Sequence, residues 1–199
     1  MTSWDKRYAE VARAYGSEPN RWLAAQAPRI RPGGRVLSLG EGEGRNAVWL
    51  ASQGFSVVAV DASSVGLEKA RRLATERGVT IETIVEDLAR YRPEPATYDA
   101  VVSIFVHLPP EIRAGVHAAA EAALKPGGVL VVEAFTPRQL AFASGGPRQA
   151  ALLYEPATLR ADFAGMEWET LGETEVDLDE GPFHQGRAAV VRGLGLRAG

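Results

Sequence analysis

The sequence predicts an α/β fold built on a mostly parallel sheet with helices on both faces. Short apolar runs alternate with segments of helical periodicity, and a glycine-rich loop follows the first run at residues 40–44. Strands that alternate with helices pair in parallel, because each crossover helix returns the chain to the same end of the sheet. The apolar runs, and therefore the expected core strands, are residues 36–39, 57–60, 79–85, 98–105 and 129–134.

Composition limits the class of protein. The chain has 199 residues, 46% of them hydrophobic, and a net charge of -3 that is spread without a basic stripe. Such a chain suits one domain with a full core, and its apolar runs are too short to span a bilayer. We expect a single soluble, cytoplasmic domain over residues 1–199, as a monomer or homodimer. Because phosphate contacts need clustered Lys and Arg, the expected partner is a small molecule, not nucleic acid or a membrane.

The sequence contains no cysteine. A disulfide framework, a zinc site with cysteine ligands and a catalytic thiolate are therefore excluded. We expect no metal site.

The segment before the first strand carries aromatic residues at helical spacing. Trp4, Tyr8 and Tyr15 belong to this series, which is followed by a turn and a second short helix around Trp22. We expect residues 1–30 to form a helical lid over the carboxyl edge of the sheet. Trp4 and Trp22 would dock the lid, and the Tyr15 hydroxyl would reach a cofactor or substrate.

The glycine loop indicates half of a nucleoside-binding site. Gly40, Gly42 and Gly44 follow the first strand, and the next strand ends on Asp61. Glycines let the loop backbone approach a ligand, and the loop feeds a helix whose free N–H groups face the same place. An acid at the tip of the second strand can accept hydrogen bonds from both ribose hydroxyls.

The glycine spacing separates two cofactors. A nicotinamide fingerprint runs G-x-G-x-x-G, but Arg45 stands where its last glycine should fall. The loop instead resembles the first motif of class I S-adenosylmethionine-dependent methyltransferases. One departure is Ser38, which replaces the acid expected before the loop, while Glu41 and Glu43 are extra acids within it. An NAD(P)-dependent reductase, a non-catalytic S-adenosylmethionine-binding protein and a turn without any ligand are the alternatives.

The resemblance implies further cofactor contacts after the second and third strands. Ser63 or Ser64 is expected to cap a helix that ends near Gly78, and the third strand leads into Asp87 and Leu88. In the family, an acid at the place of Asp87 bonds the adenine amine; its alternative role is to cap the next turn. The implied cofactor contacts are Gly40, Glu41, Gly42, Gly44, Arg45, Asp61, Ala62, Asp87, Leu88 and Tyr15.

Two residues near strand tips are candidate catalytic groups. His107 follows the fourth strand, and Glu133 lies near the tip of the fifth. Ligands of open α/β sheets bind outside the carboxyl ends of the strands, so both positions are suitable. The Asn- or Asp-Pro-Pro-aromatic signature of amine-directed nucleic-acid methyltransferases is missing at this place.

The rest of the chain completes the resemblance. Leu-Lys-Pro-Gly-Gly precedes the fifth strand. We expect residues 35–134 to form the cofactor-binding core. Residues 135–165 are expected to form a substrate-side insertion with a helix at 152–164, and residues 166–194 an antiparallel edge hairpin. With the opening Trp-Asp-x-Arg-Tyr, the turn Tyr15-Gly16-x-x-Pro19-Asn20, the loop Gly-Glu-Gly-Glu-Gly-Arg-Asn-Ala and the segment Glu180-Gly181-x-x-His184-x-Gly186, the chain resembles the small bacterial tellurite-resistance methyltransferases. That resemblance implies a seven-stranded Rossmann-like sheet and S-adenosyl-L-methionine as cofactor.

The implied acceptor is a small molecule, a chalcogen oxyanion or a thiol. A soft chalcogen needs little deprotonation, whereas an alcohol or amine needs a general base such as His107. An oxyanion needs fixed cations, for which Arg138 and Arg148 are candidates. Phe105 and His184 complete the predicted substrate contacts.

Overall fold

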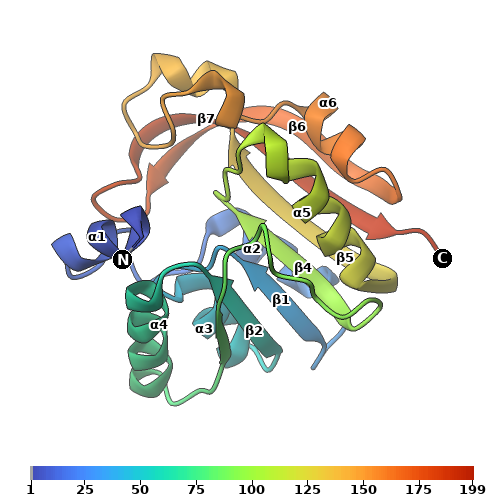
Figure 1. Cartoon of the computed structure of the whole chain (residues 1–199), viewed down its shortest axis with the longest axis horizontal. Coiled ribbons are helices and arrows are strands. Elements are labelled where there is room, and N and C mark those ends of the chain that lie inside the picture. The colour runs from blue at the N-terminus through green and yellow to red at the C-terminus, as the bar shows by residue number, and fades with distance from the viewer. Residues whose placement is uncertain (1) are drawn as a thin grey trace.

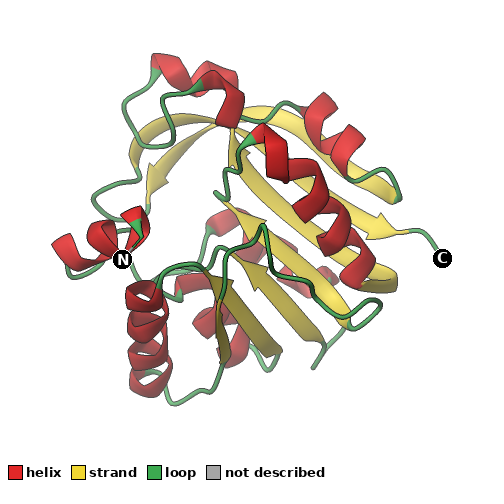
Figure 2. Ribbon diagram, in the orientation of Figure 1, coloured by secondary structure: helices red, strands yellow, loops and turns green. Residues whose placement is uncertain are grey.

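The computed structural model describes residues 2–199, and its centre is a seven-stranded sheet (Figures 1 and 2). The strand order is β3-β2-β1-β4-β5-β7-β6, with β7 antiparallel to both of its neighbours. This confirms the predicted mostly parallel sheet with its antiparallel edge pair. The strands are β1 (Arg35–Leu39), β2 (Ser56–Asp61), β3 (Glu82–Val85), β4 (Tyr98–Ile104), β5 (Leu124–Phe135), β6 (Met166–Asp179) and β7 (Gln185–Arg197).

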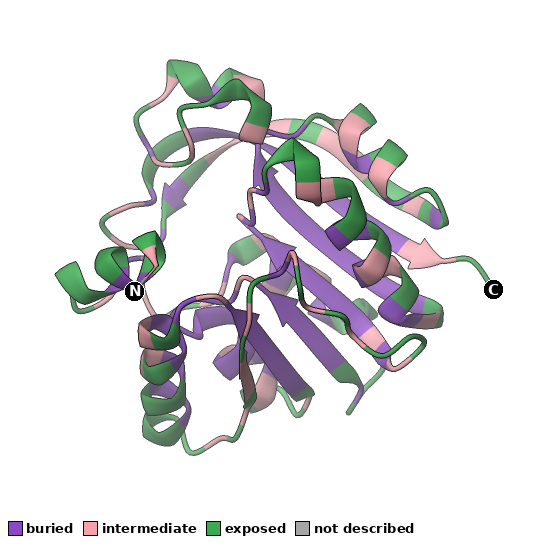
Figure 3. Cartoon of the chain, viewed as in Figure 1, coloured by how far each residue is buried: buried purple, intermediate pink, exposed green. Residues whose placement is uncertain are grey.

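Helices cover both faces, and the central strands between them are buried (Figure 3). The helices are α1 (Ser3–Glu10), α2 (Arg21–Gln26), α3 (Arg45–Ser52), α4 (Ser64–Glu76), α5 (Pro110–Ala123) and α6 (Pro156–Asp162), with short 3-10 turns η1 (Ala27–Arg29), η2 (Pro137–Ala141) and η3 (Ala150–Leu152). Apolar residues of α2, α3 and α4 pack on one face, and those of α5 and α6 on the other. Alternate strand residues supply the two cores, since successive side chains point to opposite faces.

Several element boundaries differ from the prediction. The first helix ends at Glu10, because Val11 is extended with φ -134°; Tyr15 therefore lies in the following loop. The expected helix over 152–164 is interrupted: η3 ends at Leu152 and α6 begins only at Pro156, whose fixed φ suits a first helical turn. The expected turn before the fifth strand lies inside β5, as a register irregularity opposite Tyr98 and Ala100.

The hairpin of β6 and β7 rises beyond the carboxyl ends of the parallel strands. Phe135, the last residue of β5, pairs with Val190, and β7 extends five residues further toward the hairpin turn. Figure 1 shows this turn approaching the N-terminal end of the chain. There Phe183 donates its backbone N–H to the Ala14 carbonyl at 3.3 Å. The hairpin turn thus meets residues 2–20, hereafter the N-terminal segment, at the edge where a ligand is expected.

Candidate cofactor and acceptor site

The glycine loop is bound directly to the tip of β2. Gly40, Gly42 and Gly44 have φ values of +57°, +63° and +88°, in the left-handed region that favours glycine. The Gly42 N–H donates to Asp61 Oδ2 at 2.8 Å, and the Ser63 N–H donates to Oδ1 at 2.7 Å. Burial raises the pKa of Asp61, although the two N–H groups oppose this. Ala62, between Asp61 and Ser63, is half-buried. Loop, acid and the predicted Ser63 cap of α4 form one unit.

The two extra acids of the loop have separate partners. Glu41 is buried and turns back toward Ser38 and the start of α3. Glu43 turns the other way, accepting the Ala14 N–H at 2.6 Å and pairing with Lys69 at 2.8 Å. One acid therefore holds the loop internally, and the other ties it to the N-terminal segment.

The N-terminal segment lies against the glycine loop. The Tyr8 ring packs over Gly42 and Gly66, and a Cβ built on Gly42 would overlap the Tyr8 hydroxyl and approach its Cζ to 2.9 Å. Lys69 of α4 also donates to the carbonyls of Tyr8, Val11 and Ala12, which satisfies groups left open where α1 ends.

Asp87 and Leu88 follow β3. Asp87 is exposed, and its Oδ1 accepts the Ala89 N–H at 2.9 Å, so the alternative role as a turn cap is present. Leu88 is buried in the core on the α5 face. A contact of Asp87 with adenine remains a prediction.

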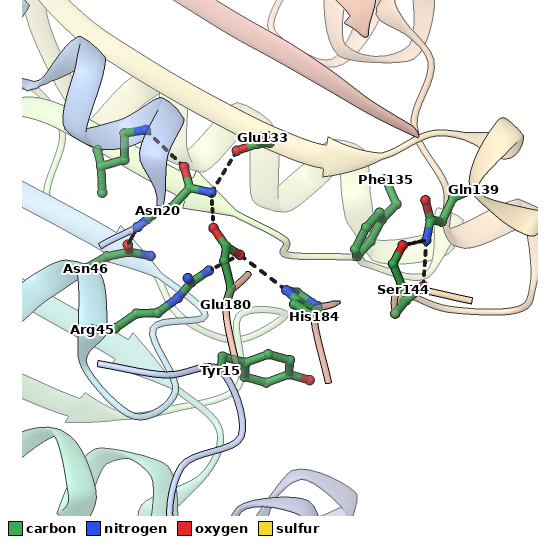
Figure 4. Close-up of polar contacts among 12 residues, drawn as sticks. Tyr15, Asn20, Arg45, Asn46, Glu133, Phe135, Gln139, Ser144, Glu180 and His184 are labelled. Atoms are coloured by element: carbon green, nitrogen blue, oxygen red, sulfur yellow. Dashed lines mark hydrogen bonds and ion pairs between the residues drawn. The ribbon is translucent and has the colours of Figure 1, made fainter. Parts of the chain in front are cut away.

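A buried polar network joins the N-terminal segment, the sheet and the hairpin turn (Figure 4). The Asn20 side-chain amide donates to Glu133 at 2.7 Å and to Glu180 at 3.0 Å. Glu133 also pairs with Arg192 at 3.1 Å, and Glu180 with Arg45 at 2.8 Å. Glu133 is thus occupied in holding Asn20 and Arg192, an arrangement that gives no support to a catalytic role.

Burial and ion pairing shift the pKa values of Glu180 and His184 in this network. Burial works against ionisation of Glu180, but its contacts with His184 and Arg45 outweigh burial and lower its pKa to about 2. Burial lowers the pKa of His184, which leaves this ring neutral. The Nη1 atom of Arg45 is buried and has no hydrogen-bond partner among residues 2–199. A buried guanidinium N–H without an acceptor is costly unless a ligand supplies one.

Aromatic rings form a wall beside this network. His184 lies 4.5 Å from Tyr15 and 4.6 Å from Phe105 between ring centroids, and Phe105 stacks on Phe135 at 4.5 Å. Phe105 has φ +55° at the tip of β4, a conformation that costs energy for a non-glycine residue and that clusters at functional sites. His184 Nδ1 faces Glu180 at 3.5 Å, and Nε2 forms no hydrogen bond within the described chain. The structure therefore brings the predicted residues Tyr15, Phe105 and His184 together.

His107 is engaged at both ring nitrogens. Nδ1 lies 2.7 Å from the Leu152 carbonyl, and Nε2 accepts the Phe135 N–H at 3.3 Å. Burial lowers the pKa of His107 to about 4. This is the geometry of a neutral histidine satisfied by the backbone, and it gives no support to the predicted catalytic role.

The two arginines expected to bind an oxyanion lie on the surface. Arg138 pairs with Glu175 on β6, and Arg148 donates to the carbonyls of Phe142 and Leu140. Both side chains are exposed and committed to these partners. These contacts give no support to a role of the two arginines in oxyanion binding, which stays a prediction.

Sequence reasoning missed four residues of the site. Asn20, Glu180, Lys69 and Tyr8 contribute to it through contacts between segments far apart in the chain. Tyr8 belongs to the Trp-Asp-x-Arg-Tyr opening, Asn20 to the Tyr15-Gly16-x-x-Pro19-Asn20 turn and Glu180 to the Glu-Gly-x-x-His segment, but these motifs alone assign no role to the three residues. Within residues 2–199 there is no cluster of three metal-ligating side chains and no helix able to cross a membrane.

Residues 36–128 match the family model of the methyltransferase domain, and the surrounding sheet has the predicted strand order and edge pair. Residues 36–128 thus carry a methyltransferase domain, and the chain is similar to class I S-adenosylmethionine-dependent methyltransferases. The 2-heptyl-1-hydroxyquinolin-4(1H)-one methyltransferase of Mycobacteroides abscessus is 30% identical to this chain over 105 residues, 51% of this chain and 46% of that protein. A ubiquinone biosynthesis O-methyltransferase of Methylocella silvestris is 35% identical over 104 residues, 52% and 41% respectively. The chain thus spans less than half the length of these relatives.

Solved structures share the fold of this chain. TehB from Haemophilus influenzae has a TM-score of 0.71 at 20% identity, covering 89% of this chain and 61% of that one. A protein studied for the conversion of a disulfide bond into a thioacetal group during echinomycin biosynthesis has a TM-score of 0.76 at 22% identity, covering 91% and 83%. Magnesium protoporphyrin IX methyltransferase from Synechocystis, with bound S-adenosylmethionine, has a TM-score of 0.64 at 22% identity, covering 89% and 75%.

S-adenosyl-L-methionine is the cofactor of this family, which confirms the predicted cofactor. The residues at this edge of the sheet fit that cofactor. Asp61 at a strand tip beside a left-handed glycine loop suits ribose hydroxyls, and the unpartnered Arg45 Nη1 suits a carboxylate.

Proposed function

We propose that the chain transfers a methyl group from S-adenosyl-L-methionine to a small, soft acceptor, a thiol or a comparable selenium compound. The aromatic wall of Tyr15, Phe105 and His184 carries this proposal, because it offers an apolar surface with one unbonded imidazole nitrogen. The cations that a selenium or tellurium oxyanion would need, Arg138 and Arg148, are committed elsewhere.

The residues of the chain would hold the cofactor, orient the acceptor and exclude water from both. The bound cofactor supplies a methyl group already activated on a sulfonium. Asp61 and Arg45 would hold its ribose and its carboxylate, while the aromatic wall aligns the acceptor and excludes water. Good alignment can contribute about 7–11 kcal/mol to such a reaction. A strong base is not required, since a thiol has a pKa of about 8.5 and is partly ionised near neutral pH.

His184 is the proposed residue for the acceptor's proton. With Nδ1–H directed at Glu180, the neutral ring presents Nε2 as an acceptor. As the acceptor sulfur bonds to the methyl carbon, the carbon–sulfur bond of the sulfonium would break and leave S-adenosylhomocysteine as a neutral thioether. Nε2 of His184 would take the thiol proton and pass it to water. Glu180 stays ionised throughout, because Arg45 and His184 hold its pKa low.

A matched acceptor pair tests the proposal. Purified protein is incubated with S-adenosyl-L-methionine labelled in the methyl group and with thiophenol, phenol or selenite. We expect thiophenol to be methylated at least about a hundredfold faster than phenol, because no tuned base faces the acceptor. Transfer only to phenol would indicate a hard acceptor, and transfer only to selenite an oxyanion site; either would overturn the proposal. His184→Asn, which removes Nε2, should slow transfer, whereas the surface variant Arg148→Ala should not.

A further inference from the structure

The end of β1 carries a serine in place of an acid. Ser38 is buried, one residue before the strand ends at Leu39. Its hydroxyl donates to a carboxylate oxygen of Glu41, three residues later in the glycine loop. A carboxylate therefore reaches this position, although it comes from the loop and not from the strand.

The other oxygen of Glu41 holds the start of α3. Oε1 accepts the backbone N–H groups of Asn46 at 3.1 Å and Ala47 at 3.0 Å. These are free donors of the first helical turn, and the residue at the N-cap is Gly44, which has no side chain to satisfy them. A negative charge is also favourable at this end of a helix.

Glu41 fixes the loop at both ends. Its backbone N–H donates to the Val60 carbonyl at 3.2 Å, next to Asp61. Its side chain joins β1, through Ser38, to α3. The backbone of residues 40–44 is thereby held between two strands and a helix, beside the acid that binds Gly42.

Ser38 and Glu41 depend on one another. An aspartate at position 38 would place a second carboxylate within hydrogen-bond distance of Glu41, and two such groups cannot both ionise without repulsion. Serine avoids this and supplies the hydrogen that an ionised carboxylate can accept. Burial raises the pKa of Glu41, and the Ala47 N–H, the Ser38 hydroxyl and the nearby Arg45 oppose this effect.

We propose that Glu41 is a positioning residue that replaces the missing strand-1 acid and, with Ser38 as its hydrogen-bond donor, sets the glycine loop for the cofactor. This inference rests on the proposed function for the identity of the ligand. Because Glu41 acts through the loop backbone, a carboxylate placed at position 38 should restore the cofactor binding that is lost when Glu41 is removed.

Moving the carboxylate from position 41 to position 38 tests the proposal. Glu41→Ala, Ser38→Asp and the double variant are compared with wild type by calorimetric titration of S-adenosylhomocysteine and by urea unfolding without ligand. Each single variant should bind at least about tenfold more weakly, the first for lack of a carboxylate and the second for excess charge. The double variant, which has one carboxylate again, should return to within about threefold of wild type. The exposed Glu111→Ala is the matched control.

The two measurements separate the possible failures. Equal binding by Glu41→Ala and wild type, with only a lower unfolding midpoint, would make Glu41 a mere helix cap and overturn the proposal. Additive losses in the double variant would overturn it as well. If wild type binds no S-adenosylhomocysteine, the proposed function fails. The urea unfolding midpoints then still test whether a carboxylate at position 38 can replace Glu41. A restored midpoint in the double variant supports this replacement, and additive losses of stability overturn it.

Discussion

Lys69 of α4 and Glu43 of the glycine loop form a 2.8 Å ion pair at the N-terminal segment. The same ammonium group donates to three carbonyls at the end of α1, and Glu43 accepts the Ala14 N–H. This pair therefore couples the cofactor loop to the chain that covers it.

Removing this ion pair should loosen the N-terminal segment selectively. In Lys69→Met the carbonyls and Glu43 lose their donor, and each buried unsatisfied group costs about 1–3 kcal/mol. We expect faster amide hydrogen exchange in residues 2–20 with unchanged exchange in β4 and β5. Lys6→Met, which removes an exposed lysine of α1, is the control. Equal effects of the two variants would mean that the segment is held by its apolar contacts alone.

Gly42 should not tolerate a side chain. In Gly42→Ala the new Cβ would overlap the Tyr8 hydroxyl at a φ of +63°, so we expect displacement of α1 and at least about tenfold weaker S-adenosylhomocysteine binding, with an unchanged far-ultraviolet spectrum. Adding Tyr8→Ala removes the overlap and leaves the backbone strain. Recovery of binding in that double variant would assign the loss to the Tyr8 contact. Normal binding by Gly42→Ala itself would contradict the assignment of the loop.

Asp61 should be required for cofactor binding. Asp61→Asn replaces one acceptor oxygen with a donor that faces the Gly42 or Ser63 N–H, and it weakens hydrogen bonds to a ribose. Bonds to a charged acceptor contribute about 1.5–3 kcal/mol each, so affinity should fall at least about tenfold by calorimetry. Asp99→Asn is a matched control, since Asp99 accepts the Arg35 N–H at 2.8 Å at the amino end of the sheet. It should lower stability only. Unchanged affinity in Asp61→Asn would remove this residue from the site.

His107 should make stability depend on pH. The folded-state pKa of His107, about 4, lies below the ordinary histidine pKa of 6.5, so the unfolded chain binds more protons between these two pH values. Stability is then fully present above pH 6.5 and is lost as pH falls toward 4, by at most about 3 kcal/mol. Unfolding in urea across this range should show a flatter profile for His107→Asn, which keeps a donor for Leu152, and for His107→Gln, which keeps an acceptor for Phe135.

Turnover of the same variants separates the roles of His107. A backbone-satisfied histidine predicts a rate per folded molecule within about threefold of wild type. A loss near a thousandfold, within the range of general-base catalysis, would restore the catalytic role and a harder acceptor.

The arginines of the insertion should be dispensable. Arg138→Ala breaks an exposed ion pair with Glu175, and such pairs contribute about 0–1 kcal/mol. We expect unchanged stability and unchanged thiol methylation for Arg138→Ala and Arg148→Ala in the labelled-methyl assay. A tenfold rate loss that is confined to selenite as acceptor would return these residues to an oxyanion site.

The sequence determined the sheet and the cofactor loop. Apolar runs that alternate with helical periodicity indicate which residues are buried. The glycines indicate which positions need a left-handed backbone, as Gly42 does at φ +63°. Both signals are local. Asp61 could be placed for the same reason, since a residue at the tip of a parallel strand lies at the edge where such sheets bind ligands.

Only the tertiary structure decided which polar groups pair. Glu41 and Glu43 are two positions apart, yet one turns to Ser38 and α3 and the other to Lys69. The sequence position of His107 suits a base, but its two ring nitrogens contact the backbone of Leu152 and Phe135. Periodicity constrains the face on which a side chain lies, whereas its hydrogen-bond partner depends on segments tens of residues away. The protonation state of each candidate residue, and whether its polar atoms are free to contact a ligand, therefore depend on how the fold brings those segments together.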